Sequence, residues 1–192
     1  ILMSFAIAND MHDTGYRSTL NPLIIAGGPN GALPHAQVTK RKFANGDMIV
    51  VDLTLRYRGY VSDATRTFGL GSISKEARTV YEIVKESQKL GLKAVKPNVN
   101  CKDVDFACRK YIEDKNYGKY FIHSTGHGIG LEVHEATTVS LRSETLLEKN
   151  MTITVETYIG KVGGKEGVKL EQQYLVGDNK LELMSFHPLE DL

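Results

Sequence analysis

Acidic residues inside apolar, strand-like runs constrain this chain more than any other feature of its sequence. Asp52 lies within the run IVVDL, and Glu156 ends the run TITVE. Each run is followed, across a turn, by a second β-type run that carries another acid, Asp63 or Glu171. A charged group on a buried strand is costly unless it has a partner. The fold therefore has to supply a partner for two pairs of acids.

Two β-hairpins are expected to carry these pairs. They are β-rich runs around glycine-containing turns: residues 48–55 with 57–68 around Arg58-Gly59, and residues 151–158 with 167–176 around Gly163-Gly164. If the first hairpin folds about residues 57 and 58, Asp52 faces Asp63, and in the second hairpin Glu156 faces Glu171. Facing side chains lie about 5 Å apart, a distance at which like charges are destabilising.

A divalent metal ion is the partner that this pattern favours. No basic residue lies in the strand segments immediately around Asp52 or Glu156. A divalent cation would neutralise the repulsion and take the acids as hard oxygen ligands. Solvated acids at sheet edges would account for any one of these residues, but not for the same pattern in two hairpins.

The remaining elements define the fold class. Apolar residues at helical spacing predict helices over residues 1–13, 74–97 and 100–115 and within 143–149. Gly15 is expected to end the first of them. Along the chain, a helical segment followed by a hairpin therefore occurs twice. We expect a mixed α/β or α+β domain with a mixed or antiparallel sheet.

Length, charge and hydropathy exclude several classes of protein. A chain of 192 residues fits one domain, and its formal net charge of +1 gives no general attraction to nucleic acid or to an anionic membrane surface. No apolar run approaches the ~20 residues that span a bilayer. Cys101 and Cys108 lie about 10 Å apart along a predicted helix, too far for a disulfide. We therefore expect reduced cysteines, a cytoplasmic protein, and no nucleic-acid or membrane partner.

Four of the six histidines lie in turn-rich or glycine-rich sequence: His35, His123, His127 and His134. The other two, His12 and His187, fit surface or packing roles. Glycines on both sides of His127 permit close backbone approach. The segment fails as a phosphate-binding loop, because Leu131 stands at the third glycine, and as a zinc-binding helix, because Ser124 replaces the catalytic Glu. Beside four carboxylates, His127 is the expected nitrogen ligand.

Several segments together resemble the metal-dependent pita-bread peptidases, the family of Xaa-Pro dipeptidase (prolidase), aminopeptidase P and methionine aminopeptidase. They are GGPNGALPH, VDLTLRYRGYVSDATRTF, FIHSTGHGIGLEVHE, TVETYIG and GVKLEQQYLV, and they cover nearly the whole chain. The resemblance implies a pita-bread fold, in which two helix-plus-hairpin halves are related by a pseudo-twofold. The run SDATRT, residues 62–67, resembles the proline-specific branch.

The resemblance also implies a ligand set. In that family two Asp, one His and two Glu bind two metal ions, and the matching positions are Asp52, Asp63, His127, Glu156 and Glu171. An oxygen-rich set with one imidazole suits Mn²⁺, Co²⁺ or Zn²⁺.

The resemblance implies roles for further residues. Glu156 would accept a proton from water and pass it to the leaving prolyl nitrogen. His35 and His134 would hydrogen-bond the substrate and the tetrahedral intermediate, and His123 would join the same pocket. Two basic residues would orient the ligand carboxylates: Arg66 and Lys169.

The implied function is hydrolysis of the peptide bond before proline, in a peptide or dipeptide with proline at the second position. Two alternatives stay open: removal of an initiator methionine, which Ser62 and Arg66 disfavour, and a catalytically inactive pita-bread binding module. Two departures bear on this choice. Thr157-Tyr158 stands where the family usually has Pro-Gly, and Lys169 stands where an Arg commonly precedes the last ligand.

The chain starts without an initiator Met, and its first residues read as the inside of a helix. Complete Xaa-Pro peptidases carry an additional N-terminal domain, for which this chain has no room. We therefore expect residues 1–192 to be the catalytic domain of a longer protein, truncated at its N-terminal side. A homodimer is compatible with the resemblance.

Overall fold

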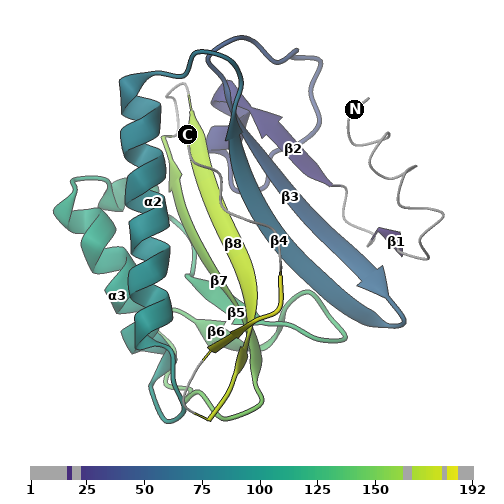
Figure 1. Ribbon diagram of the computed structural model, residues 1–192, viewed down its shortest axis with the longest axis vertical. Helices are drawn as coiled ribbons and strands as arrows, with labels where there is room; N and C mark the ends of the chain where they lie inside the picture. The colour runs from purple at the N-terminus through teal and green to yellow at the C-terminus, as the bar shows by residue number, and fades with distance from the viewer. Residues whose placement is uncertain (1–16, 19–22, 162–165, 179–180, 186–192) are drawn as a thin grey trace.

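Two helices cover one side of a large, curved antiparallel sheet. The computed structural model of the protein describes residues 17–18, 23–161, 166–178 and 181–185. The helices α2 and α3 lie together on the left of Figure 1, and the strands β3 and β4 sweep away to the right. Every strand pair among the described residues is antiparallel. The expected combination of helices with a mixed or antiparallel sheet is confirmed.

The described elements follow one another along the chain in this order: β1 (Arg17–Ser18), β2 (Ile24–Gly27), the 3₁₀ helix η1 (Gly28–Ala32), β3 (Met48–Tyr57), β4 (Tyr60–Gly69), α2 (Lys75–Ala94), α3 (Cys101–Asp114), the 3₁₀ helix η2 (Gly118–Tyr120), β5 (Gly126–Gly128), β6 (Glu135–Val139), β7 (Thr152–Gly160), β8 (Gly167–Val176) and β9 (Leu181–Leu183). The strand order in the sheet is β1-β3-β4-β8-β7-β5-β6, with β2 paired to β3 and β9 paired to β8. Both predicted hairpins are present, and β4 joins β8 at the contact between them.

The two helices begin at the polar caps that the sequence predicts. The Ser74 hydroxyl accepts a hydrogen bond from Ala77 N at 2.9 Å at the start of α2. The Asn100 side chain accepts one from Lys102 N at 3.1 Å at the start of α3. Such caps satisfy backbone donors that have no partner within the helix. Both helix predictions are confirmed.

The helix predicted within residues 143–149 is wrong. The segment runs beside the start of α3, where Leu146 forms an isolated β-bridge with Asn100 and Leu147 N donates to Val99 O at 2.8 Å. Leu147 is fully buried. Because backbone groups pair with a distant segment here, they cannot form the local ladder of a helix.

Some expectations lie outside the described residues. They are the helix over residues 1–13 with Gly15, the turn at Gly163-Gly164, and the roles of His12 and His187.

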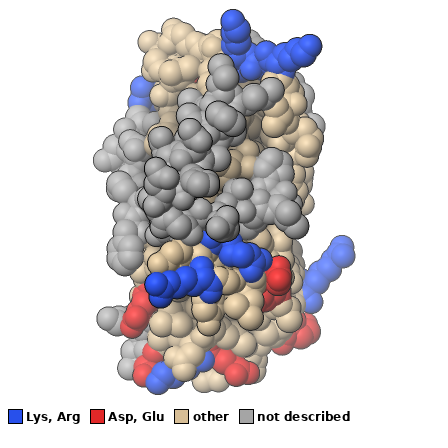
Figure 2. All heavy atoms as spheres, turned by 90° about the vertical axis from the view of Figure 1, so that its right-hand side faces the viewer, with Lys and Arg blue, Asp and Glu red and all other residues tan. Residues whose placement is uncertain are grey.

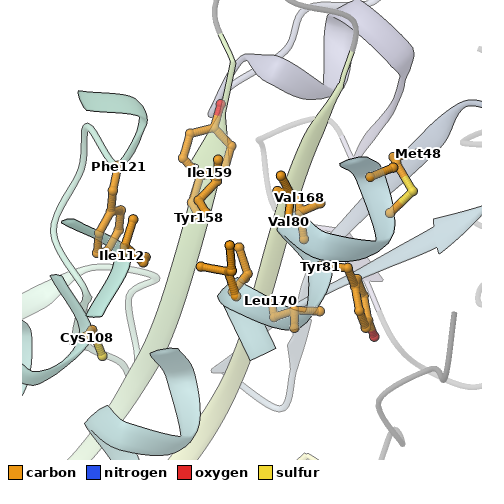
Figure 3. Close-up of a cluster of buried hydrophobic side chains, with 13 residues drawn as sticks. Met48, Val80, Tyr81, Cys108, Ile112, Phe121, Tyr158, Ile159, Val168 and Leu170 are labelled. Carbon is orange, nitrogen blue, oxygen red and sulfur yellow. The ribbon is translucent and has the colours of Figure 1, made fainter. Parts of the chain in front are cut away.

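The main hydrophobic core lies between the helices and the hairpin β7–β8. Figure 3 shows buried side chains of α2, α3, β7 and β8 that belong to one cluster, among them Tyr81, Ile112 and Leu170. All three are fully buried. Burial of apolar side chains of this size is the main favourable term in folding, at roughly 25 cal/mol per Å² removed from water.

The strand β7 has a second buried face, turned away from the helices. The Thr157 hydroxyl donates to Val84 O of α2 at 3.0 Å, so Thr157 points toward the helices. Successive strand residues point to opposite faces of a sheet. The neighbouring Glu156 therefore lies on the face that the helices do not cover.

Charges of both signs share the surface on the right-hand side of Figure 1. Figure 2 shows acidic and basic side chains intermixed over its lower part and basic side chains at its upper end. No helix in the described ranges combines the length and the apolar character needed to cross a membrane. Both cysteines, Cys101 and Cys108, are buried and free, as predicted.

The helix α3 holds the segment that leads into β5. Asp105 is fully buried, and its Oδ1 accepts hydrogen bonds from Thr125 N at 3.1 Å and Thr125 Oγ1 at 2.7 Å. Its other oxygen pairs with Arg109 Nε at 2.8 Å. Arg109 in turn donates to the carbonyls of Phe121 and His123, both at 2.8 Å. These bonds fix the path of the chain immediately before β5.

Replacing Asp105 with Ala is expected to lower the free energy of unfolding by about 3–5 kcal/mol, because the Arg109 guanidinium loses its buried partner. Urea denaturation followed by circular dichroism measures the change. Asp103→Ala, an exposed position on the same helix, is the matched control and should cost less than about 1 kcal/mol. Equal losses in the two variants would contradict the anchoring role.

Candidate metal centre

A two-residue loop sets the register of the first hairpin. In Arg58-Gly59, both residues have positive φ, 50° and 94°, as a type I′ turn requires. The loop brings Asp52 opposite Thr65 and Asp63 opposite Thr54. The prediction that Asp52 faces Asp63 is therefore wrong, because the hairpin folds one position further along the chain. Asp52 therefore pairs with a residue two positions beyond the predicted one. Because side chains alternate between the faces of a strand, a shift of two residues leaves both acids on the same face of the sheet.

The second hairpin has the predicted register, and it joins the first one at the acids. Glu156 pairs with Glu171 across β7 and β8. Thr65 of β4 pairs with Glu171 of β8, and its hydroxyl donates to Glu171 Oε2 at 2.9 Å. Arg66 Nη1 donates to the Glu171 carbonyl at 2.8 Å. The contact between β4 and β8 thus brings the acids of both hairpins together.

His127 enters the site from β5, where a glycine permits close approach. A Cβ on Gly126 would lie 2.1 Å from the Thr154 carbonyl oxygen, so a larger residue cannot stand there without a shift of the backbone. His127 Nδ1 lies 3.0 Å from the Gly128 carbonyl oxygen. A carbonyl only accepts, so Nδ1 carries the hydrogen and Nε2 of the neutral ring presents its lone pair to the acids.

Three possible ligand atoms meet at His127, and they lie too far apart to be hydrogen-bonded to one another. His127 Nε2 lies 3.8 Å from Asp63 Oδ2 and 3.8 Å from Glu171 Oε1. Asp63, His127 and Glu171 each offer a ligand atom, and these atoms lie within 4.8 Å of one another. Glu171 Oε1 is buried and has no hydrogen-bond partner in the described part of the chain. Lone pairs that converge in this way fit a divalent cation, so the residues present suit a metal ion.

Lys169 fills the other half of the cluster. Its Nζ lies 3.0 Å from Asp52 Oδ2, 3.0 Å from Glu156 Oε2 and 3.1 Å from Glu171 Oε2. Sequence analysis expected this lysine to orient carboxylates, but not its ammonium in the middle of three of them. The available signal was its position on β8 two residues before Glu171, since alternate strand residues share a face.

The charges in the cluster do not balance. Four carboxylates, from Asp52, Asp63, Glu156 and Glu171, surround one ammonium, and all of these side chains are buried. Burial, followed by repulsion from Asp52, raises the pKa of Asp63 to about 8. Burial also raises the pKa of Glu171 well above its usual value. For Glu156, burial acts in the same direction, but attraction by Lys169, His123 and His127 together outweighs it and lowers the pKa to about 2.

A cavity of about 350 Å³ opens above this cluster. Its volume is within the range of small-molecule sites, roughly 300–1,000 Å³. All four histidines that the sequence singled out line it, together with most of the acids: His35, His123, His127, His134, Asp52, Asp63 and Glu156. Glu171, which has no exposed surface, lies beneath the cavity lining.

The histidines present different groups to the cavity. His35 and His134 are exposed, and the ring of His134 packs against His127 with 4.1 Å between centroids. His123 is fixed between Phe121 and Tyr158. Its Nδ1 lies 2.7 Å from a backbone carbonyl oxygen, while its Nε2 is buried without a partner in the described residues. Burial lowers the pKa of His123 and keeps this nitrogen an acceptor.

Three residues that support the site were missed or left without a role in the sequence analysis. Thr54 donates to Asp63 Oδ1 at 3.2 Å, and Thr65 donates to Glu171 as described. Tyr158 packs against His123 and donates its hydroxyl to Ala32 O at 2.6 Å, which ties β7 to η1. The threonines could have been found from their alternation with the acids, whereas the contact with η1 spans 126 positions of the chain.

Comparisons with known proteins agree on one family. Residues 3–178 match the model of metallopeptidase family M24. The chain is 44% identical over 158 residues to the Xaa-Pro dipeptidase of Pyrococcus furiosus, an alignment that covers 81% of this chain and 44% of the relative. The chain spans about half the length of the relatives it matches.

Two solved structures share the fold. The prolidase from Pyrococcus furiosus superposes with a TM-score of 0.93 at 36% identity, over 97% of this chain and 55% of that one. The X-Pro aminopeptidase from Thermotoga maritima gives a TM-score of 0.94 at 34% identity, over 98% and 53% of the two chains. The pita-bread fold that the sequence resemblance implied is confirmed.

The raised pKa of Asp63 predicts that the protein in chelator loses stability as pH rises from about 7 to 9. In that range Asp63 of the unfolded chain is already ionised, whereas Asp63 of the folded chain loses its proton only near pH 8. The folded state therefore binds more protons than the unfolded state, and the free energy of unfolding falls as pH rises. The histidines His123 and His127, whose pKa values are lowered, are neutral in both states there.

Thermal unfolding in EDTA, followed by circular dichroism across this range, measures the effect. Asp63→Asn cannot ionise at this position, so its profile should be less steep than that of the wild type. A midpoint that rises with pH would contradict the charge state assigned to the cluster.

Proposed function

The chain belongs to metallopeptidase family M24, and from this premise we propose that it is the catalytic domain of a metal-dependent peptidase that cleaves the bond before proline. The observation that carries the proposal is the convergence of four acids and one imidazole at a cavity that most of them line. The relatives named Xaa-Pro dipeptidase and X-Pro aminopeptidase support the choice of substrate. We extend the domain over residues 1–192.

The proposed ligands are the five residues that the resemblance implied: Asp52, Asp63, His127, Glu156 and Glu171. Two divalent ions, Mn²⁺, Co²⁺ or Zn²⁺, are the expected set. When bound, such ions lower the pKa of water to make a nucleophile and polarise the scissile carbonyl. The unpartnered Glu171 Oε1 and the lone pair of His127 Nε2 support a metal at this position.

Glu156 is the proposed acceptor of the proton that the attacking water releases. One of its oxygens contacts Lys169, and the other lies 3.9 Å from His127 Nε2. The low pKa of Glu156, about 2, keeps it ionised at neutral pH. It lines the cavity, so it can pass the proton on to the leaving prolyl nitrogen, which must gain one when the bond breaks.

Three histidines are proposed to bind the substrate. His123 lines the cavity, and its Nε2 is a buried acceptor without a partner in the described residues, so it suits an N–H group of the peptide. His35 and His134 are exposed and line the same cavity, where they can hydrogen-bond the substrate and the tetrahedral intermediate. The volume of about 350 Å³ supports a dipeptide or the end of a longer peptide.

Two alternative functions of the same site can be tested. Removal of an initiator methionine would use the same chemistry, and a binding module would keep the fold without turnover. The free, buried cysteines support a cytoplasmic location. A homodimer stays a prediction.

The full-length protein loaded with Mn²⁺ or Co²⁺ is expected to hydrolyse Xaa-Pro dipeptides and to leave Met-Ala peptides intact. Release of free proline measures the reaction. Turnover of the Met-Ala peptide alone would favour methionine removal, and a protein that holds metal but hydrolyses neither substrate would favour the binding module.

Glu156→Gln is expected to lower kcat by about 10²–10⁴-fold, the usual contribution of general acid–base catalysis. Metal content, measured in parallel by mass spectrometry, separates loss of proton transfer from loss of a ligand. Glu144→Gln, which changes an exposed acid paired with Lys102, is the matched control and should leave kcat unchanged. An unchanged kcat in Glu156→Gln would exclude the proton-transfer role.

A further inference from the structure

The four carboxylates of the centre form two unequal positions for a cation. The first lies at Asp63 Oδ2, His127 Nε2 and Glu171 Oε1, which the Lys169 ammonium does not contact. The second lies among oxygens of Asp52, Glu156 and Glu171, and there the Lys169 ammonium makes three contacts of 3.0–3.1 Å. Glu171 belongs to both positions, because its Oε1 faces the first and its Oε2 faces the second.

The ammonium meets the requirements of the second position closely. It has three N–H donors and contacts three carboxylate oxygens. The side chain is 9% exposed, and the backbone of Lys169 is fixed to β4, because its N and O atoms both bond the Thr67 hydroxyl. This is a built position for a positive charge, and not a surface lysine that happens to lie nearby.

A metal ion that uses Asp52 as a ligand has to compete with this ammonium. The competition is unequal, because a group tethered to the site acts at an effective concentration in the millimolar range or above. A free ion at micromolar concentration does not have that advantage, although it carries twice the charge. The first position has no such competitor among the described residues.

We infer that Lys169 is a built-in occupant of one of the two cation positions, so that its ammonium competes with the second divalent ion and weakens the binding of that ion. The inference rests on the proposed metal centre and refines it. The second ion enters when the ammonium moves away from Asp52 and Glu156 into the cavity that Lys169 already lines.

Metal stoichiometry tests this directly. After gel filtration in metal-free buffer, the full-length protein loaded with Mn²⁺ is expected to retain one ion per chain, whereas Lys169→Met, which keeps the chain length and removes the charge, should retain two. Titration calorimetry should show the second ion bound more than about tenfold tighter in the variant than in the wild type. Lys149→Met removes an exposed lysine paired with Asp178 and should match the wild type.

A measurement on the wild type keeps the inference testable if Lys169→Met does not fold. Amine acetylation, located by peptide mass spectrometry, should spare Lys169 at one equivalent of Mn²⁺ and modify it when excess Mn²⁺ fills the second position. The exposed Lys149 should react equally under both conditions.

The outcomes separate this inference from the proposed function. Two equally tight ions in the wild type, or one ion in both proteins, would overturn the inference and leave the peptidase intact. Persistent protection of Lys169 with two ions bound would also overturn it. Absence of tight metal from both proteins would overturn the inference and the metal-dependent function together.

Discussion

The structure depends on the accumulation of negative charge at one buried point. Four carboxyl groups from two hairpins converge around a single ammonium, and Glu171 Oε1, which faces His127, has no hydrogen-bond partner in the described part of the chain. Buried charges of one sign are tolerated only when cations or protons compensate them. The sheet geometry, the glycine beside Thr154 and the anchoring of β5 by α3 all hold this costly arrangement together. A site so costly to assemble is typical of catalysis.

Local signals were sufficient to predict much of the fold. Helices α2 and α3 follow from apolar spacing and from the polar caps at Ser74 and Asn100. The position of Gly163-Gly164 in the sequence was enough to predict that Glu156 pairs with Glu171, and the strands have that register. The four histidines near the cavity were recognised by their glycine-rich and turn-rich surroundings.

Non-local contacts account for what could not be predicted. The register of the first hairpin depends on Arg58 adopting a positive φ, which a non-glycine residue seldom does. Residues 143–149 look helical in isolation, but they pair with residues some 45 positions earlier. Lys169 meets Asp52 across 117 positions, and that meeting exists only because β4 and β8 are neighbours. No local pattern contains that information.

The contact between β4 and β8 has one more consequence. The centre straddles the join between the two hairpins: Asp52 and Asp63 come from one side, and Glu156 and Glu171 from the other. Neither hairpin alone supplies all of the proposed ligands. An ion bound between the hairpins would stabilise their contact, so that metal binding and the stability of the fold would be thermodynamically coupled.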